Sequence, residues 1–248
     1  QVSGNAPKQI SDGKWNDRDP VWSPDGQQLA FLSNRGGTPG VWVMNYLGET
    51  PALLQPLDIN GYSLLSWSKQ RQTIYLQHNG NLIALNLSNG QRTPLTDFDP
   101  RQAPGNDFAV SPDETLLAYT MRQDGQARVI IKPLRGGNPR QISFDEGSAR
   151  SPVWFPDSQQ LAYCADKGGR YQLYLGTVAG GTPETLLVSD DNQERVAVSP
   201  DGRQLITSGN RQNANLIAYD LVTGQETSYS ADFGLQLYPE LSPDGQQL

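Results

Sequence analysis

The sequence has very little of the two residue types on which many metal and redox sites depend. Its 248 residues include one cysteine, Cys164, and one histidine, His78. A single thiol excludes an internal disulfide and leaves the redox compartment open. A single imidazole excludes metal sites built from several histidines. We expect Cys164 to be a buried, inert thiol and His78, which precedes the turn pair Asn79-Gly80, to be a solvated hairpin residue.

The sequence also lacks long apolar runs and an excess of basic residues. No run approaches the roughly 18 apolar residues of a membrane-spanning helix, and no segment has the pattern of a signal peptide. Nineteen Lys and Arg residues face 26 Asp and Glu residues, which gives a formal net charge of -7. Phosphate binding needs clustered cations. We therefore expect no nucleic-acid contact and no direct membrane insertion.

The chain does contain a repeat, of which VWSPDGQQLAFLS at 21–33 is the clearest copy. One position recurs about every 44 residues; it is occupied by Ser23, Ser68, Ser111, Phe155, Ser199 and Ser242. The Pro-Asp-Gly that follows is typical of a tight turn between two strands.

Each repeat contains four short strand patterns, which in the first repeat lie at 20–22, 28–32, 41–44 and 52–54. A second recurrent turn, Gly-Gly-x-Pro at 180–183, precedes the outermost strand, where proline is tolerated. We find no convincing helix. Four strands in a period of about 40 to 45 residues predict an all-β fold, a β-propeller of four-stranded antiparallel blades.

We expect one propeller domain over 1–248, with six blades that start near residues 19, 64, 107, 151, 195 and 238. A strand at 6–11 would complete the last blade, whose front half begins at 238. About fifteen residues of that blade are missing by the repeat period. We therefore expect a chain that is truncated or that continues beyond both ends.

The segments 21–33, 153–187 and 197–205 resemble TolB-type propeller repeats, and the resemblance covers nearly the whole chain. This class includes periplasmic proteins of the Tol-Pal envelope system, sensor domains of CadC-type transcriptional regulators, and domains that precede a hydrolase in prolyl-oligopeptidase-like peptidases. The resemblance implies a non-catalytic periplasmic domain that binds an envelope protein or peptide segment. The alternative is a propeller of an enzyme, either a peptidase's accessory domain or a glycosidase with carboxylates in its channel.

In such a blade the loops before the first strand and after the second strand share one face, which is irregular and rich in charge. The turns on the other face are uniform and indicate scaffold. Loops on a rigid scaffold commonly carry binding residues. The candidate ligand- or partner-binding residues are Asp17, Arg18, Asp19, Asn60, Tyr62, Arg101, Asn106, Asp107, Glu146, Arg150, Asp191, Glu194 and Arg195.

Four arginines of this set, at 18, 101, 150 and 195, would hold a carboxylate-bearing peptide at the channel mouth through bidentate hydrogen bonds. The alternative is that they form ordinary exposed ion pairs. We expect no catalytic residue, no metal and no cofactor, because the recurrent aspartates are explained by the turns and the Gly-Gly pairs precede no helix. Trp22, Trp67 and Trp154 share one repeat position, and we expect them to pack between blades.

Overall fold

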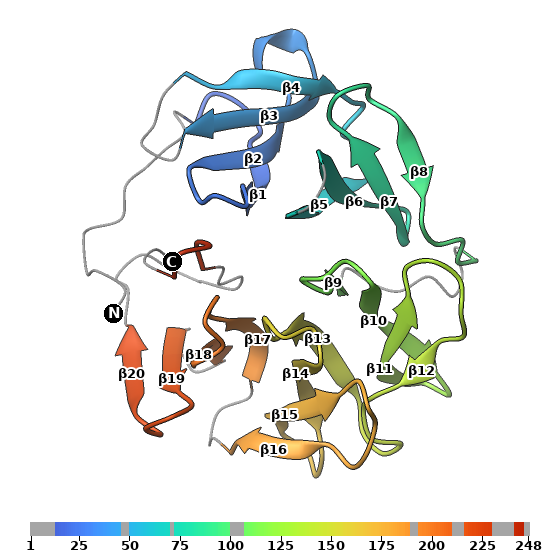
Figure 1. The fold of residues 1–248 in the computed structure, drawn as a ribbon, viewed down its shortest axis with the longest axis vertical. Helices are drawn as coiled ribbons and strands as arrows, with labels where there is room; N and C mark the ends of the chain where they lie inside the picture. The colour runs from blue at the N-terminus through green and yellow to red at the C-terminus, as the bar shows by residue number, and fades with distance from the viewer. Residues whose placement is uncertain are drawn as a thin grey trace. The chain divides into compact units, whose positions relative to one another are not determined.

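A computed structural model describes residues 13–45, 50–69, 72–99, 107–188, 193–209, 216–229 and 241–245. These residues form five four-stranded antiparallel sheets (Figure 1). The one helical element among them is a short 3-10 turn, η1 (Arg35–Gly37). No helix in the described part of the chain is long and apolar enough to cross a membrane.

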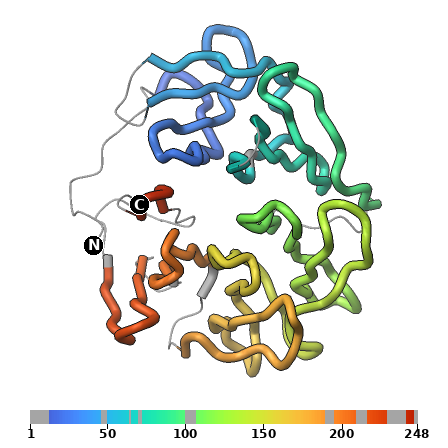
Figure 2. Tube along the Cα trace, viewed as in Figure 1, coloured from blue at the N-terminus to red at the C-terminus, as the bar shows by residue number. Residues whose placement is uncertain are grey.

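The chain divides into two compact units, which we describe separately. Unit 1 comprises Gln1–Asn106 and Ser242–Gln246, and unit 2 comprises Asp107–Leu241 and Gln247–Leu248. Figure 2 traces unit 2 from green to orange, and each sheet is completed before the next begins. Whether the units form the single domain predicted above stays a prediction.

Unit 1 contains two blades. Blade 1 consists of β1 (Arg18–Trp22), β2 (Gln28–Ser33), β3 (Gly40–Asn45) and β4 (Ala52–Pro56). Blade 2 consists of β5 (Tyr62–Trp67), β6 (Thr73–His78), β7 (Asn81–Asn86) and β8 (Arg92–Pro94).

Unit 2 contains three blades. Blade 3 consists of β9 (Phe108–Val110), β10 (Leu116–Gln123), β11 (Gln126–Pro133) and β12 (Arg140–Gln141). Blade 4 consists of β13 (Ala149–Trp154), β14 (Gln160–Asp166), β15 (Tyr171–Thr177) and β16 (Glu184–Leu187). Blade 5 consists of β17 (Gln193–Val198), β18 (Gln204–Gly209), β19 (Leu216–Asp220) and β20 (Glu226–Tyr229).

The predicted architecture of four antiparallel strands per repeat is confirmed, but the predicted blade count is not. The described residues contain five four-stranded blades rather than six. The strand expected at 6–11 lies outside the described residues, and only 241–245 of the last repeat is described.

The serine of the repeated turn has a role that the sequence reading did not assign. Ser23 Oγ donates to Asp25 Oδ1 over 2.6 Å and accepts from the Gln28 backbone N–H over 2.9 Å. The same pair forms in blade 5, where Ser199 Oγ donates to Asp201 Oδ1 over 2.6 Å. Each serine is nearly fully buried, so its hydroxyl fastens the turn from inside.

These hydrogen bonds also set the charge state of the turn. The pKa of Asp25 and of Asp201 lies below its ordinary value of 3.8. The main cause is the hydrogen bond from the serine hydroxyl, and the second is a hydrogen bond from the backbone N–H two residues after the aspartate. Hydrogen bonds to a carboxylate stabilise its charged form.

The residue after the aspartate must adopt a left-handed backbone. Gly26 has a φ of 70° and Gly202 a φ of 71°, while Glu114 and Ser158 occupy the same position with φ of 59° and 58°. Such values strain any residue that has a Cβ atom. Glycine is therefore the better residue here, and blades 3 and 4 carry some strain.

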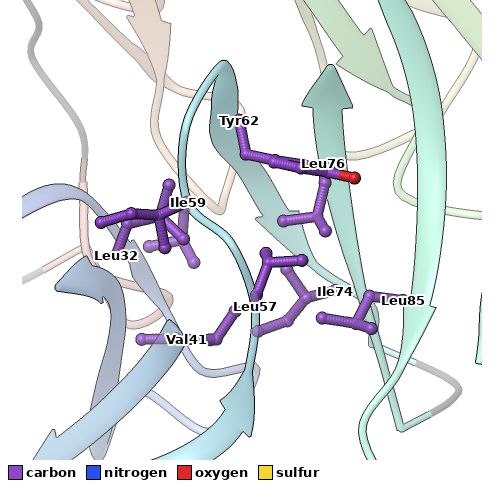
Figure 3. Close-up of a cluster of buried hydrophobic side chains, with 10 residues drawn as sticks. Leu32, Val41, Leu57, Ile59, Tyr62, Ile74, Leu76 and Leu85 are labelled. Atoms are coloured by element: carbon purple, nitrogen blue, oxygen red, sulfur yellow. The ribbon is translucent and has the colours of Figure 1, made fainter. Parts of the chain in front are cut away.

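Hydrophobic cores form where neighbouring blades face each other. Figure 3 shows the core of unit 1, in which Leu32 and Val41 of blade 1 meet Ile74, Leu76 and Leu85 of blade 2. The loop between the blades adds Leu57 and Ile59 to the same cluster, and Tyr62, the first residue of β5, completes it. That loop is therefore anchored by burial of its own side chains, which is the dominant favourable term in folding.

Tryptophan packing between blades is confirmed at two of the three predicted positions. Trp154 of blade 4 is buried with residues of blade 3, and its Nε1–H donates to the Ala109 carbonyl over 2.9 Å. Trp67 packs against the core shared by blades 1 and 2. Trp22 packs on Leu29, Phe31 and Met44 of its own blade, and its packing between blades stays a prediction.

Adjacent blades also touch at the repeated turns between their first and second strands, which we call the serine turns, although blade 4 has Phe155 at the serine position. The Asp113 N–H of blade 3 donates to Ser158 Oγ of blade 4 over 3.1 Å. A Cβ atom on Gly202 of blade 5 would lie 3.3 Å from Cδ of Pro156 in blade 4. In unit 1 a Cβ atom on Gly26 would lie 3.5 Å from Cδ of Pro243. The turn at 242–245 thus lies beside blade 1 in the way that a preceding blade does.

Candidate functional site

The loop before the first strand and the loop after the second strand lie together, as predicted. In blade 1, Arg35 Nη2 donates to Asp17 Oδ2 over 2.6 Å. In blade 4, the Asp166 N–H donates to the Ser148 carbonyl over 2.8 Å. We call the loop before each first strand its leading loop.

A β-bulge re-aims the side chains where the leading loop becomes the first strand. The register shifts between Arg18 and Val21 in blade 1 and between Arg150 and Val153 in blade 4. Each bulge contains a residue with a left-handed backbone, which is Asp19 (φ 52°) or Ser151 (φ 55°). Bulges of this kind redirect side chains and are common beside functional sites.

Arg18, for which ligand binding stays a prediction, holds the leading loop of the next blade. Its Nη1 donates to the Tyr62 carbonyl over 2.6 Å, and its Nη2 donates to the Ile59 carbonyl over 2.6 Å. Nη1 also pairs with Asp19 Oδ2 at 2.7 Å. Two backbone acceptors and one carboxylate occupy this guanidinium.

The candidate residues of the blade 2 leading loop are also engaged locally. Asn60 donates through its N–H and its Nδ2 to Asp58 Oδ1, over 3.1 and 2.8 Å. Tyr62 is buried and stacks on His78, with ring centroids 4.0 Å apart. His78 Nδ1 lies 3.2 Å from the Gly61 carbonyl. The predicted hairpin after His78 is confirmed, but the ring is half-buried against this loop rather than solvated.

The candidates of unit 2 form a cluster that draws on three consecutive blades. Arg195 Nη1 of blade 5 donates to Asp107 Oδ1, just before blade 3, over 2.5 Å and to Ser151 Oγ of blade 4 over 3.3 Å. The Ser151 N–H in turn donates to Asp107 Oδ2 over 3.3 Å. We call Asp107, Ser151 and Arg195 the three-blade cluster.

Arg150 lies next to this cluster in sequence and has a different environment. Its guanidinium carbon lies 3.9 Å from the centroid of the Tyr171 ring. Its Nε atom is buried and has no hydrogen-bond partner. Stacking on an aromatic face is a favoured arrangement for arginine, so Arg150 is held flat at the start of β13.

The remaining candidates have no contact to report, because they are either exposed or outside the described residues. Glu146 is exposed in the leading loop of blade 4. Glu194 lies on β17, but its side chain is outside the described part. Arg101, Asn106 and Asp191 lie outside the described residues altogether.

Sequence reasoning missed Arg128, which positions the leading loop of blade 4. This buried arginine on β11 donates to the carbonyls of Asp145 and Gly147 and, over 2.5 Å, to Gln126 Oε1. An arginine beside Val129 and Ile130 breaks the apolar pattern of the strand, and this was the available signal. Ser151 and Tyr171 were also missed.

No group of three or more His, Cys, Asp and Glu side chains that could hold a metal ion occurs in the described part of the chain. Cys164 is fully buried, as predicted. The chemistry that the described clusters offer is therefore charge pairing and hydrogen bonding at the leading-loop end of the blades.

These features define the class of the protein as a β-propeller protein built from four-stranded antiparallel blades. The family model described as TolB beta propeller domain matches residues 65–248, and the chain belongs to this family. The TolB-like resemblance of the repeats is thereby confirmed.

Solved structures share this fold at low sequence identity. The putative TolB from Agrobacterium tumefaciens has a TM-score of 0.76 at 18% identity, over 96% of this chain and 90% of that chain. TolB from Acinetobacter baumannii has a TM-score of 0.75 at 16% identity, over 94% of this chain and 58% of that one. This chain thus spans little more than half the length of the Acinetobacter protein.

An enzyme is also similar in fold. A puromycin-hydrolyzing peptidase from Mycobacterium tuberculosis has a TM-score of 0.65 at 16% identity, over 93% of this chain and 42% of that one. At these identities the likeness concerns the fold, which many unrelated functions share.

Proposed function

We propose that this chain is a non-catalytic propeller that binds a protein or peptide segment in the bacterial cell envelope. The binding surface in this proposal is the leading-loop end of the blades, at the channel mouth. The observation that carries it is the three-blade cluster, which gathers charged groups on the ends of rigid strands. Such placement on a scaffold is how binding residues are commonly presented.

The periplasmic location and the envelope partner rest on the family to which the chain belongs and on the names of its structural relatives. The sensory role is part of the same proposal, as is the expectation of no nucleic-acid contact, which rests on the net charge of -7. That the whole chain forms a single domain is part of the same proposal.

Site-specific crosslinking tests the binding surface. A photoreactive amino acid is placed at exposed Glu146 or Lys167, at the leading-loop end of blade 4, and the protein is mixed with a bacterial envelope fraction. The matched controls carry the same group at exposed Gln159 or Arg203, in the serine turns at the opposite end. We expect a discrete adduct from the first two positions only. Adducts that form equally at both ends, or at the turns alone, contradict the proposal.

A second candidate is the propeller of an enzyme, either a peptidase's accessory domain or a glycosidase. It is supported by the similarity in fold to the puromycin-hydrolyzing peptidase. Assays of the natural full-length protein with aminoacyl and glycoside substrates separate the candidates. Turnover that disappears after substitution of a residue in this chain would favour the enzyme.

A further inference from the structure

The arginines near the leading loops differ in whether backbone carbonyls are among the acceptors of their hydrogen bonds. Arg18 and Arg128 donate to backbone carbonyls of the following leading loop. Arg195 donates to two side-chain atoms, Asp107 Oδ1 and Ser151 Oγ. A backbone acceptor cannot leave without moving the loop, whereas a side-chain acceptor can turn away by changing its rotamer.

The Arg195–Asp107 pair is also accessible to solvent. The Arg195 side chain is 31% exposed and the Asp107 side chain 16% exposed. Water and salt reach the exposed part of the pair and screen it, which lowers its net contribution to stability. Little free energy therefore opposes replacement of Asp107 by another carboxylate.

The geometry favours a carboxylate as the replacement. The guanidinium of arginine matches a carboxylate in shape and charge and commonly binds it through two parallel hydrogen bonds. Asp107 shows that a carboxylate fits at this place, because Oδ1 accepts from Arg195 and Oδ2 accepts from the Ser151 N–H. An incoming acidic side chain would find the same two donors.

We propose that Arg195 binds an acidic side chain of the peptide. In the unbound protein Asp107 pairs with Arg195, and the acidic side chain of the peptide displaces it. This inference rests on the proposed function, since it names the chemistry of the partner at the same surface. An Asp or Glu side chain is the occupant. A terminal carboxylate is usually captured by a nest of backbone N–H groups, and the one such N–H seen in the cluster, that of Ser151, already serves Asp107.

The test uses the full chain and two peptides, N-acetylated and C-amidated hexaglutamate and hexaglutamine. Affinity is measured by isothermal titration calorimetry, and the contact itself is followed by NMR through the Nε–H signal of Arg195 in the proteins that keep this arginine. Hexaglutamate is expected to shift this signal, and hexaglutamine is not. Asp107→Asn removes the competing charge and keeps an amide oxygen for the Ser151 N–H, so hexaglutamate should bind roughly tenfold more tightly.

Three variants complete the design. Asp124→Asn, in the exposed β10–β11 turn, removes one negative charge from the same end of unit 2 without touching the pair, and should change the affinity less than about twofold. Arg195→Gln should weaken binding by about tenfold or more. Arg195→Lys keeps the charge but not the planar fork, and is expected to fall between wild type and Arg195→Gln. Thermal unfolding of each variant shows whether it is folded.

The inference is overturned if Asp107→Asn binds hexaglutamate no more tightly than Asp124→Asn does. It is also overturned if folded Arg195→Gln binds as well as wild type. The crosslinking experiment above reports on the proposed function separately. Envelope adducts that persist unchanged in Arg195→Gln would leave the proposed function standing and remove this inference from it.

Discussion

The Arg18 guanidinium and the Tyr62 carbonyl are joined by a 2.6 Å hydrogen bond that links blade 1 to the leading loop of blade 2. The same guanidinium holds the Ile59 carbonyl. We expect Arg18→Met to lower the free energy of unfolding by about 2 kcal/mol, because both carbonyls lose a charged donor. Urea denaturation measures the change. Arg122→Met, at an exposed arginine on β10, is the control and should stay within about 0.5 kcal/mol of wild type.

The serine turns predict how stability depends on pH. Because the folded pKa of Asp25 and of Asp201 lies below 3.8, the folded protein binds fewer protons than the unfolded chain at acidic pH. The stabilisation is complete well above pH 3.8 and is lost as the pH falls through that value and then through the lower folded pKa.

We expect the melting temperature to fall less between pH 6 and pH 3 in the double variant Asp25→Asn, Asp201→Asn than in the wild type. Differential scanning calorimetry at several pH values checks this. Asp124→Asn, in the β10–β11 turn, serves as the control and should keep the wild-type slope. A double variant with the wild-type slope would show that these turns do not contribute.

The left-handed position of the serine turn predicts substitutions of opposite sign. Glu114→Gly removes the strain of a φ of 59°, which favours the folded state. Glycine also raises the conformational entropy of the unfolded chain, which offsets part of this gain, so the net stabilisation should be about 0.5 to 1 kcal/mol. Gly202→Ala introduces the same strain and brings a Cβ atom to 3.3 Å from Pro156, so it should destabilise by roughly 1 to 2 kcal/mol. Equal effects of one sign in chemical denaturation would contradict this explanation.

The hydrogen bond from Trp154 to the Ala109 carbonyl predicts a stability difference between two tryptophans. Trp154→Phe keeps most of the apolar area but leaves this carbonyl without its donor, which should cost about 1 to 2 kcal/mol. Trp15→Phe, at a tryptophan 42% exposed, should be nearly neutral. Thermal unfolding of both variants measures the difference.

The strands could be predicted from the sequence because the repeat places the same alternation and the same turn residues in every copy. The first repeat shows this: strands expected at 28–32 and 52–54 are observed at Gln28–Ser33 and Ala52–Pro56. The sixth blade was predicted from the same repeat, and the described residues do not contain it.

The site was harder to predict, because sequence gives the charge of a residue and not its acceptor. Arg18 and Arg150 occupy the same repeat position, yet one binds loop carbonyls and the other stacks on Tyr171. One signal was available: aligning the repeats places Asp107, Ser151 and Arg195 at a single position. Opposite charges two repeats apart at one position indicate that those strand ends meet.

The contact between the turn at 242–245 and blade 1 has a consequence for the order of folding. Gly26 and Pro243 lie 217 residues apart in the sequence, whereas the strands of each blade pair with near neighbours in sequence. The loop-closure entropy of such a contact is the largest in unit 1. Each sheet can therefore form soon after it leaves the ribosome, but the exposed side of blade 1 acquires its neighbour only when synthesis reaches the last repeat. Until then, this side of blade 1 lacks that neighbour, and surfaces left uncovered during folding favour aggregation.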